Sequence, residues 1–339
     1  MTRFLFYVPD SRNPTGGLNV IFDLIQTLKT LGFDAEAICS SPDASYRYMS
    51  PEPSILYIPG IVEPASVKQR AMNWGRNIAK VRRNAVAELR PDDLIVVPEF
   101  LSDWLPGMFA KQKCVLLNQG YYVVANVATS EMWDPKAFVA TISMSEACHQ
   151  MAELMGLKRL YRIPLAINHD EFAGTEQKRN VIAFMPRRRE MDVRIVVKLL
   201  KDRGQVGDFE LRPLDKMQHH DVAKAMGEAS IFLSFSELEG FGLPPAEAMS
   251  AGCVVVGYTG VGGKEYFDAE VGFPIEDGNI KDFVLCVEAV AERCRSGDAG
   301  IAAMRRKASA RIRERYGRQS HVDQVKRVFG ALSKGLTNE

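Results

Sequence analysis

The stretch Ser234-Phe-Ser-Glu-Leu-Glu-Gly-Phe-Gly-Leu-Pro-Pro-Ala-Glu-Ala-Met-Ser-Ala-Gly-Cys253 decides how this chain folds. It begins as an apolar run typical of a buried strand, continues through a glycine-containing loop, and becomes a helix that ends at a glycine. The two prolines are tolerated because the first turn of a helix has no intrahelical use for its amides. This order predicts a parallel α/β unit whose loop lies at the carboxyl end of a strand, where such proteins bind ligands.

The same alternation of short apolar strands and amphipathic helices runs through most of the chain, so we expect α/β architecture. A polar stretch over 164–178 interrupts it, and 339 residues suffice for two domains. We therefore expect an N-terminal domain over 1–163, a connector over 164–178, a C-terminal domain over 179–317, and a last helix over 318–339. The expected strands lie at 4–8, 34–38, 55–58, 94–97, 114–117, 138–142, 160–163, 181–185, 209–212, 231–235 and 254–257.

Composition excludes several classes of protein. Forty-three Lys and Arg against 42 Asp and Glu leave a net charge of +1, which argues against a whole-molecule field for nucleic acid. No apolar run reaches the ~18 residues that span a bilayer, and the first apolar run is too short for a signal peptide. Six scattered cysteines without a C-x-x-C pair predict reduced thiols and a cytoplasmic protein. They are Cys39, Cys114, Cys148, Cys253, Cys286 and Cys294.

Two carboxylates in the opening stretch carry the candidate chemistry. Glu239 lies in the loop and Glu247 lies inside the helix, so both can face one elongated ligand. Carboxylates suit sugar and ribose hydroxyls because they accept hydrogen bonds in a fixed geometry, and the first-turn amides of the helix suit phosphate. The plain alternative is a loop carboxylate and a solvated helix residue.

This segment resembles the E-x7-E signature of glycosyltransferase family 4, which comprises retaining enzymes of the GT-B fold. The pattern E-G-F-G-L-P-P-A-E-A-M-x-x-G, followed by an apolar strand and a glycine-rich turn, matches over most of the second half. The first half agrees more loosely, through Gly16-Gly17 and Ser143-x-Ser145-Glu146. Further stretches are similar to a bacterial polysaccharide branch with rhamnosyltransferase-like members. They are Ala183-Phe-Met-Pro-Arg-Arg188, Leu116-Leu-Asn-Gln119 and Val97-Pro-Glu99.

The resemblance implies two Rossmann-like domains that face a central cleft, with the C-terminal helix crossing back to the N-terminal domain. Glu247 would hold the ribose hydroxyls, Glu239 would contact the transferred sugar, and Arg187 or Arg188 would bind the diphosphate. An ordinary solvated basic cluster is the alternative for the arginines. Backbone at glycine-rich positions would approach donor phosphate or sugar oxygens, at Gly16, Gly17, Phe241, Gly242, Leu243, Gly262 and Gly263.

One departure concerns the cleft histidine that many family members place near the transferred sugar. None of the five histidines follows the middle strand of the first domain, where Asn118 and Gln119 stand instead. We expect these residues or Glu99 to face the acceptor or the donor sugar, against the alternative of ordinary loop capping. His219 and His220 precede a helix, and their position favours surface residues over a ligand pair.

Other ligands find little support. The turn after Tyr258 fails the phosphate-loop pattern because Glu265 follows the lysine, and no G-x-G-x-x-G follows the first strand. Without an Asp-x-Asp motif or a histidine cluster we expect no metal site, and no cofactor beyond the sugar nucleotide. The basic stretch 64–87 is interpreted as a solvated helix face or as a peripheral contact with an anionic membrane. The residues of that contact would be Arg76, Lys80, Arg82 and Arg83.

The resulting hypothesis is a retaining, metal-independent transferase acting on a nucleoside-diphosphate sugar and a glycan or glycolipid acceptor in bacterial surface polysaccharide synthesis. It would move a hexose or deoxyhexose and would involve no nucleic acid. The rival hypotheses are a non-catalytic sugar-nucleotide-binding or scaffolding protein of the same fold and a nucleotide-sugar epimerase.

Overall fold

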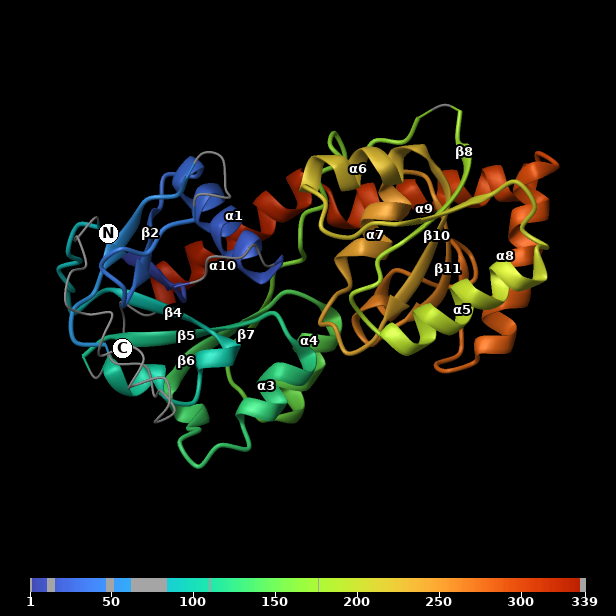
Figure 1. The fold of residues 1–339 in the computed structure, drawn as a ribbon. Helices are drawn as coiled ribbons and strands as arrows, with labels where there is room; N and C mark the ends of the chain where they lie inside the picture. Colours follow the sequence, from blue (N-terminus) through green and yellow to red (C-terminus); the bar gives the residue numbers. More distant parts are fainter. Residues whose placement is uncertain are drawn as a thin grey trace. The chain divides into compact units, whose positions relative to one another are not determined.

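The computed structural model describes residues 2–10, 16–46, 52–61, 84–109, 111–175 and 177–335. The chain forms two compact units, each built on its own parallel sheet (Figure 1). Unit 1 comprises Met1–Met144, Cys148–Ile163 and Val322–Glu339, and unit 2 comprises Ser145–Ala147 and Pro164–His321. Within the described residues, no helix is both long and apolar enough to cross a membrane.

The sheet of unit 1 has seven parallel strands in the order β3-β2-β1-β4-β5-β6-β7. Its central strands are continuous apolar runs because helices cover both faces of the sheet. The sequence order of the strands reverses between β1 and β4, which creates a ligand-binding switch point at the carboxyl edge there. The strands are β1 (Arg3–Tyr7), β2 (Asp34–Cys39), β3 (Ile55–Tyr57), β4 (Leu94–Pro98), β5 (Lys113–Asn118), β6 (Phe138–Ser143) and β7 (Leu160–Arg162).

Side chains of β1 alternate between the two halves of the unit 1 core. Leu5 and Tyr7 join the cluster beneath α3 (Tyr121–Val127), whereas Phe4 packs edge-on against Phe329 at 4.9 Å between ring centroids. Phe329 belongs to α10 (Arg318–Gly335), the last helix of the chain, so unit 1 contains both the earliest and the latest described elements. Two further helices follow strands of this sheet, α1 (Gly16–Thr30) after β1 and α4 (Glu146–Leu154) after β6.

The sheet of unit 2 has five parallel strands in the order β12-β11-β10-β8-β9. Figure 1 shows α5 and α8 over one face of this sheet and α6, α7 and α9 over the other. The strands are β8 (Arg179–Phe184), β9 (Glu210–Pro213), β10 (Ala229–Ser236), β11 (Val254–Thr259) and β12 (Phe273–Ile275). The helices are α5 (Glu190–Arg203), α6 (His219–Glu228), α7 (Leu243–Ser250), α8 (Ile280–Arg295) and α9 (Ala299–Tyr316).

The predicted strands are confirmed with small shifts at their ends, and so is the break between the last two helices at Gly317. The short edge strand β12 was not expected, because three residues with a central proline give no periodic signal. The predicted helix over 64–87 is wrong at its end. There, Val86 forms an isolated bridge with Tyr57, and Ala85 is not helical. The remainder, with Arg76, Lys80, Arg82 and Arg83, lies outside the described residues.

As predicted, the six cysteines, all within the described residues, form no disulfide; four are buried and two are half-buried. Burial raises the pKa of Cys114 to about 12 and that of Cys286 to about 11, so both thiols stay protonated at neutral pH.

A half-buried ammonium group joins the ends of two helices in unit 2. Lys178 Nζ donates to the carbonyl of Gly227 at 2.6 Å, to that of Met226 at 3.3 Å, and to that of Ala251. The first two carbonyls end α6 and the third ends α7, where carbonyls have no intrahelical partner. Burial lowers the pKa of Lys178, because desolvation disfavours its charged form. The three carbonyl dipoles oppose this effect and stabilise the ammonium charge.

Lys178→Met is therefore expected to lower the free energy of unfolding by about 2 kcal/mol, because it removes the charged donor from all three carbonyls. Among the described residues, Gly227 and Met226 keep only the neutral donors of Thr175 and Cys253. Urea denaturation monitored by circular dichroism measures the change. Lys201→Met, at an exposed position in the last turn of α5, is the matched control and should alter stability by less than about 0.5 kcal/mol. Equal effects of the two substitutions would contradict the capping role.

Candidate functional site

Three predicted residues meet at the carboxyl edge of the unit 2 sheet. Strand order reverses between β8 and β10, so the loops after these two strands flank the switch point. Arg187 and Arg188 follow β8, and Glu239 follows β10. Arg188 Nε lies 3.7 Å from Glu239 Oε1, so a cation and a carboxylate face each other where a ligand of this sheet is expected.

The loop that carries Glu239 is anchored by aromatic burial. Phe241 is buried with its ring 4.9 Å from those of Tyr266 and Tyr316. The Tyr266 hydroxyl donates to the carbonyl of Gly242, and burial raises the pKa of Tyr266, which keeps this donor protonated. Gly242 has φ +85°, a left-handed conformation that favours glycine, and it begins α7. One buried side chain and one hydroxyl therefore determine where the helix starts.

Three backbone amides are left open at this helix start. Within the described chain, we find no hydrogen-bond partner for the amides of Phe241, Gly242 and Leu243. The next two residues, Pro244 and Pro245, have no N–H, so the open donors end at Leu243. A group of unpaired amides at a helix N-terminus is suited to an anion.

The backbone of Gly262 is engaged in contacts with the neighbouring loop and is not open to a ligand. Its amide donates to the Glu239 carbonyl at 3.2 Å, and a Cβ built there would lie 2.2 Å from the Gly240 oxygen. The expectation that its amide meets a donor oxygen is therefore wrong, because close contact between two loops already uses it. Gly263 lies beside it in the same turn, and its carbonyl accepts from the amides of Tyr266 and Phe267.

The three consecutive arginines after β8 have different partners. Arg189 Nη2 pairs with Asp277 at 2.6 Å, and its guanidinium lies 4.8 Å from the centre of the Tyr258 ring. These contacts give Arg189 a structural role. Arg187 contacts Asp215 at 3.3 Å and is well exposed, as is Arg188. Exposed pairs of this kind are weak, so both guanidinium groups can exchange their carboxylate for a phosphate.

Glu247 lies on α7 with 12% of its side chain exposed, and its neighbour is a histidine. His219 Nε2 lies 3.9 Å from Glu247 Oε1, and His219 Nδ1 lies 2.8 Å from Glu171 Oε1. The interpretation of the two histidines as surface residues is confirmed for both, since His220 is exposed and 57% of the His219 side chain is exposed, but it did not include the pairing of His219. No spacing within one element could have shown it, because His219 begins α6, Glu247 lies in the second turn of α7, and Glu171 lies in the connector.

In unit 1, three expected residues gather beside the switch point. A Cβ built on Gly17, in the first turn of α1, would lie 3.6 Å from the Gln119 side-chain oxygen, an ordinary contact. Neither packing nor a positive φ therefore requires glycine at this exposed position.

Glu99 follows β4 and is 5% exposed, with Oε2 unpaired among the described residues. Burial raises the pKa of Glu99 to about 7, although the backbone amides of Glu99 and Gln119 oppose the shift.

Asn118 does not face a ligand, so this part of the expectation is wrong. Its side chain is fully buried, and Nδ2 donates to the Cys148 carbonyl at 3.0 Å. The residue ends β5 pointing into the core, whereas Gln119, one position later, is half-exposed. The one-residue difference in direction is the alternation expected of a strand.

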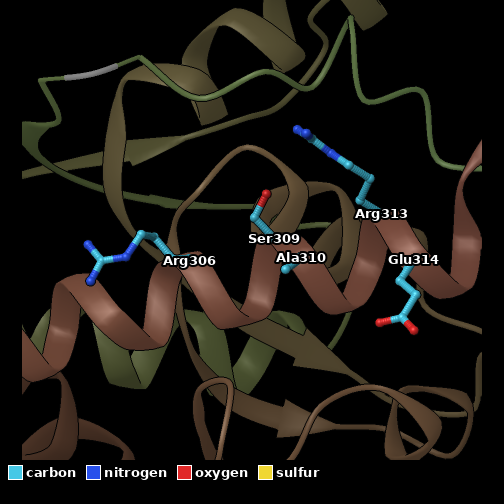
Figure 2. Close-up of a pocket in the computed structure, with 5 residues that line it drawn as sticks. All are labelled: Arg306, Ser309, Ala310, Arg313 and Glu314. Atoms are coloured by element: carbon cyan, nitrogen blue, oxygen red, sulfur yellow. The ribbon is translucent and has the colours of Figure 1, made fainter.

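A pocket of about 520 Å³ lies elsewhere in unit 2, along an exposed face of α9. Figure 2 shows Ser309 and Arg313 on the same side of the helix, with Glu314 turned the other way. None of the predicted site residues lines this pocket; its lining residues are Arg306, Ser309, Ala310, Arg313 and Glu314. In the part of the chain that the structure describes, no three His, Cys, Asp or Glu side chains cluster as metal ligands.

Comparison with known proteins agrees with this geometry. Residues 212–297, which contain Glu239 and Glu247, match the family described as glycosyl transferases group 1. An alpha-1,6-glucosyltransferase of Actinobacillus pleuropneumoniae serotype 7 is 25% identical over 340 residues, covering 95% of this chain and 93% of the relative.

Solved glycosyltransferase structures share the fold over nearly the whole chain. Anabaena HepE in complex with UDP and glucose has a TM-score of 0.67 and 14% identity, covering 98% of this chain and 99% of that one. A glycosyltransferase from Rickettsia africae has a TM-score of 0.65 and 14% identity, covering 97% of this chain and 98% of that one. The chain thus has the GT-B fold, and together with the group 1 match this identifies the protein as a glycosyltransferase.

Proposed function

We propose that the protein is a retaining, metal-independent glycosyltransferase that moves a hexose or deoxyhexose from a nucleoside-diphosphate sugar to a glycan or glycolipid acceptor. Its expected setting is bacterial surface polysaccharide synthesis. The observation that carries the proposal is the placement of Arg188 and Glu239, 3.7 Å apart, beside three open amides at one sheet edge. Cleavage of the sugar–phosphate bond leaves negative charge on the diphosphate, and fixed cations and amide dipoles stabilise such charge.

The proposed roles follow from position. Arg187, Arg188 and the amides of 241–243 bind the diphosphate, Glu247 accepts hydrogen bonds from the ribose, and Glu239 accepts them from the transferred sugar. In unit 1, Gly17 leaves room for a phosphate oxygen to approach the backbone, and Gln119 or Glu99 contacts a sugar hydroxyl. The Actinobacillus relative is named as a glucosyltransferase, and HepE was crystallised with UDP-glucose, so UDP-glucose is the first donor to test.

Glu247→Ala should abolish nucleotide binding, because no other carboxylate is assigned to the ribose. UDP at 100 times its dissociation constant should raise the unfolding free energy of the unsubstituted protein by about 2.7 kcal/mol, and this should persist in EDTA. Thermal shifts with UDP, GDP, dTDP and CMP measure the effect. Glu314→Ala, at an exposed glutamate on α9, is the control and should keep the full shift. A shift that requires Mg²⁺ would contradict metal independence.

Glu239→Gln should separate nucleotide binding from transfer. The amide oxygen can still accept the loop hydrogen bond from the Glu237 backbone, so the loop keeps its shape. UDP should bind as before, while kcat/KM for transfer from the sugar nucleotide falls about 100-fold, as for other single groups that bind the transition state. Product analysis by NMR reports the anomeric configuration. Binding without any turnover by the unsubstituted protein would favour the non-catalytic alternative.

Glu99→Gln should raise the free energy of unfolding and lower the rate of sugar transfer. The folded-state pKa of about 7 lies above the ordinary value of 4.5, so ionisation of Glu99 destabilises the fold as pH rises between these values. The cost is complete above pH 7 and amounts to about 3 kcal/mol. Urea denaturation should therefore show a larger gain for the variant at pH 8 than at pH 5. A gain accompanied by unchanged transfer would refute the sugar-contacting role.

A further inference from the structure

The His219 ring is held from three directions within unit 2. Its edge packs against buried Phe172, with 5.3 Å between ring centroids and 86° between ring planes. Nδ1 lies 2.8 Å from Glu171 in the connector, and Nε2 lies 3.9 Å from Glu247 on α7. The ring plane and both nitrogen directions are therefore determined by groups from different elements.

The connector that supplies Glu171 and Phe172 is itself attached to α7. Ser250 Oγ donates to the Phe172 carbonyl at 3.2 Å, and it also lies 2.6 Å from His169 Nδ1. The amide of Glu171 bonds Asn168 Oδ1 at 3.3 Å, which closes the turn. The support of the imidazole is thus connected to the same helix that carries Glu247.

We propose that His219 is a positioning residue for donor binding, which orients the Glu247 carboxylate toward the ribose of a nucleoside diphosphate. This inference rests on the function proposed above and deepens it. A glutamate side chain has three rotatable bonds, and ordering them costs free energy each time a ligand binds. A cation fixed beside the carboxylate removes part of that cost before the nucleotide arrives. Among the described residues, the ion-pair contact of His219 is to Oε1 of Glu247, so Oε2 can accept from the ribose.

The pairing persists over the neutral range. Proximity to Glu247 and to Glu171 raises the pKa of His219 to about 9, although burial opposes the shift. The charged groups facing the ring are Glu171 from the connector and Glu247 from α7, and Asp221 lies in the first turn of α6 itself. The imidazolium is therefore present below about pH 9 and is lost as pH rises through that value, so donor affinity should fall there.

The test compares His219→Ala, His219→Gln and His219→Arg with His220→Ala, the adjacent exposed histidine, as control. Isothermal titration with UDP gives Kd between pH 7.5 and 10, and initial rates with UDP-glucose give KM and kcat. We expect His219→Ala to raise Kd about tenfold, which corresponds to about 1.4 kcal/mol. His219→Arg should restore most of the affinity, and kcat at saturating donor should stay within about twofold of the unsubstituted value. The rise in Kd near pH 9 should vanish in His219→Gln.

Two outcomes would overturn the inference separately from the function. If the unsubstituted protein binds UDP and His219→Ala binds it equally well, the positioning role is refuted and the proposed function stands. The same holds if His219→Ala raises Kd by the same factor in the unsubstituted protein and in Glu247→Gln, since a positioning residue must show coupling to Glu247 in this double-mutant cycle. If the unsubstituted protein binds none of UDP, GDP, dTDP and CMP, both proposals fall.

Discussion

The burial of Phe241 is the constraint on which the unit 2 site depends. A loop that ends β10 with glycines on either side of one aromatic ring has few internal contacts of its own. Its shape is set by the packing of that ring between Tyr266 and Tyr316 and by the hydroxyl of Tyr266 on the Gly242 carbonyl. Because the loop is fixed in this way, α7 begins at Leu243, and both glutamates are placed relative to the sheet edge.

The sequence was sufficient for the architecture and for the residues of the central loop. Apolar strands with periodic helices between them predict parallel sheets, and parallel sheets bring the ends of their strands to one edge. The resemblance, and not the periodicity, assigned Arg188 and Glu239 to one ligand, and in the structure their side chains lie 3.7 Å apart. The sequence could not tell Asn118 from Gln119, since a strand that ends one residue later reverses the direction of both side chains. It also could not show His219 beside Glu247, because such a pair depends on how α6 and α7 pack against each other.

Polar groups buried in this protein follow two different rules. The ammonium of Lys178 donates to helix carbonyls, and these contacts offset the free-energy cost of its partial burial. Glu99 is buried at least as deeply, yet one of its oxygens has no partner among the described residues. A carboxyl group in that condition lowers the stability of the fold, which is common where stability is given up for activity.

The placement of Phe329 against Phe4 has a consequence for the order of events on the ribosome. In unit 1, β1 is translated before unit 2, whereas the part of α10 that belongs to the unit 1 core, over 322–335, is translated after it. Domains generally fold in the order of synthesis. Here unit 2 is fully translated before residues 322–335 of α10, and until these residues have been made, Phe4 and Phe6 of β1 lack the Phe329 ring that packs against them. During that interval the nascent chain exposes an apolar sheet face, and a chaperone that binds such surfaces would be needed most for the half that was made first.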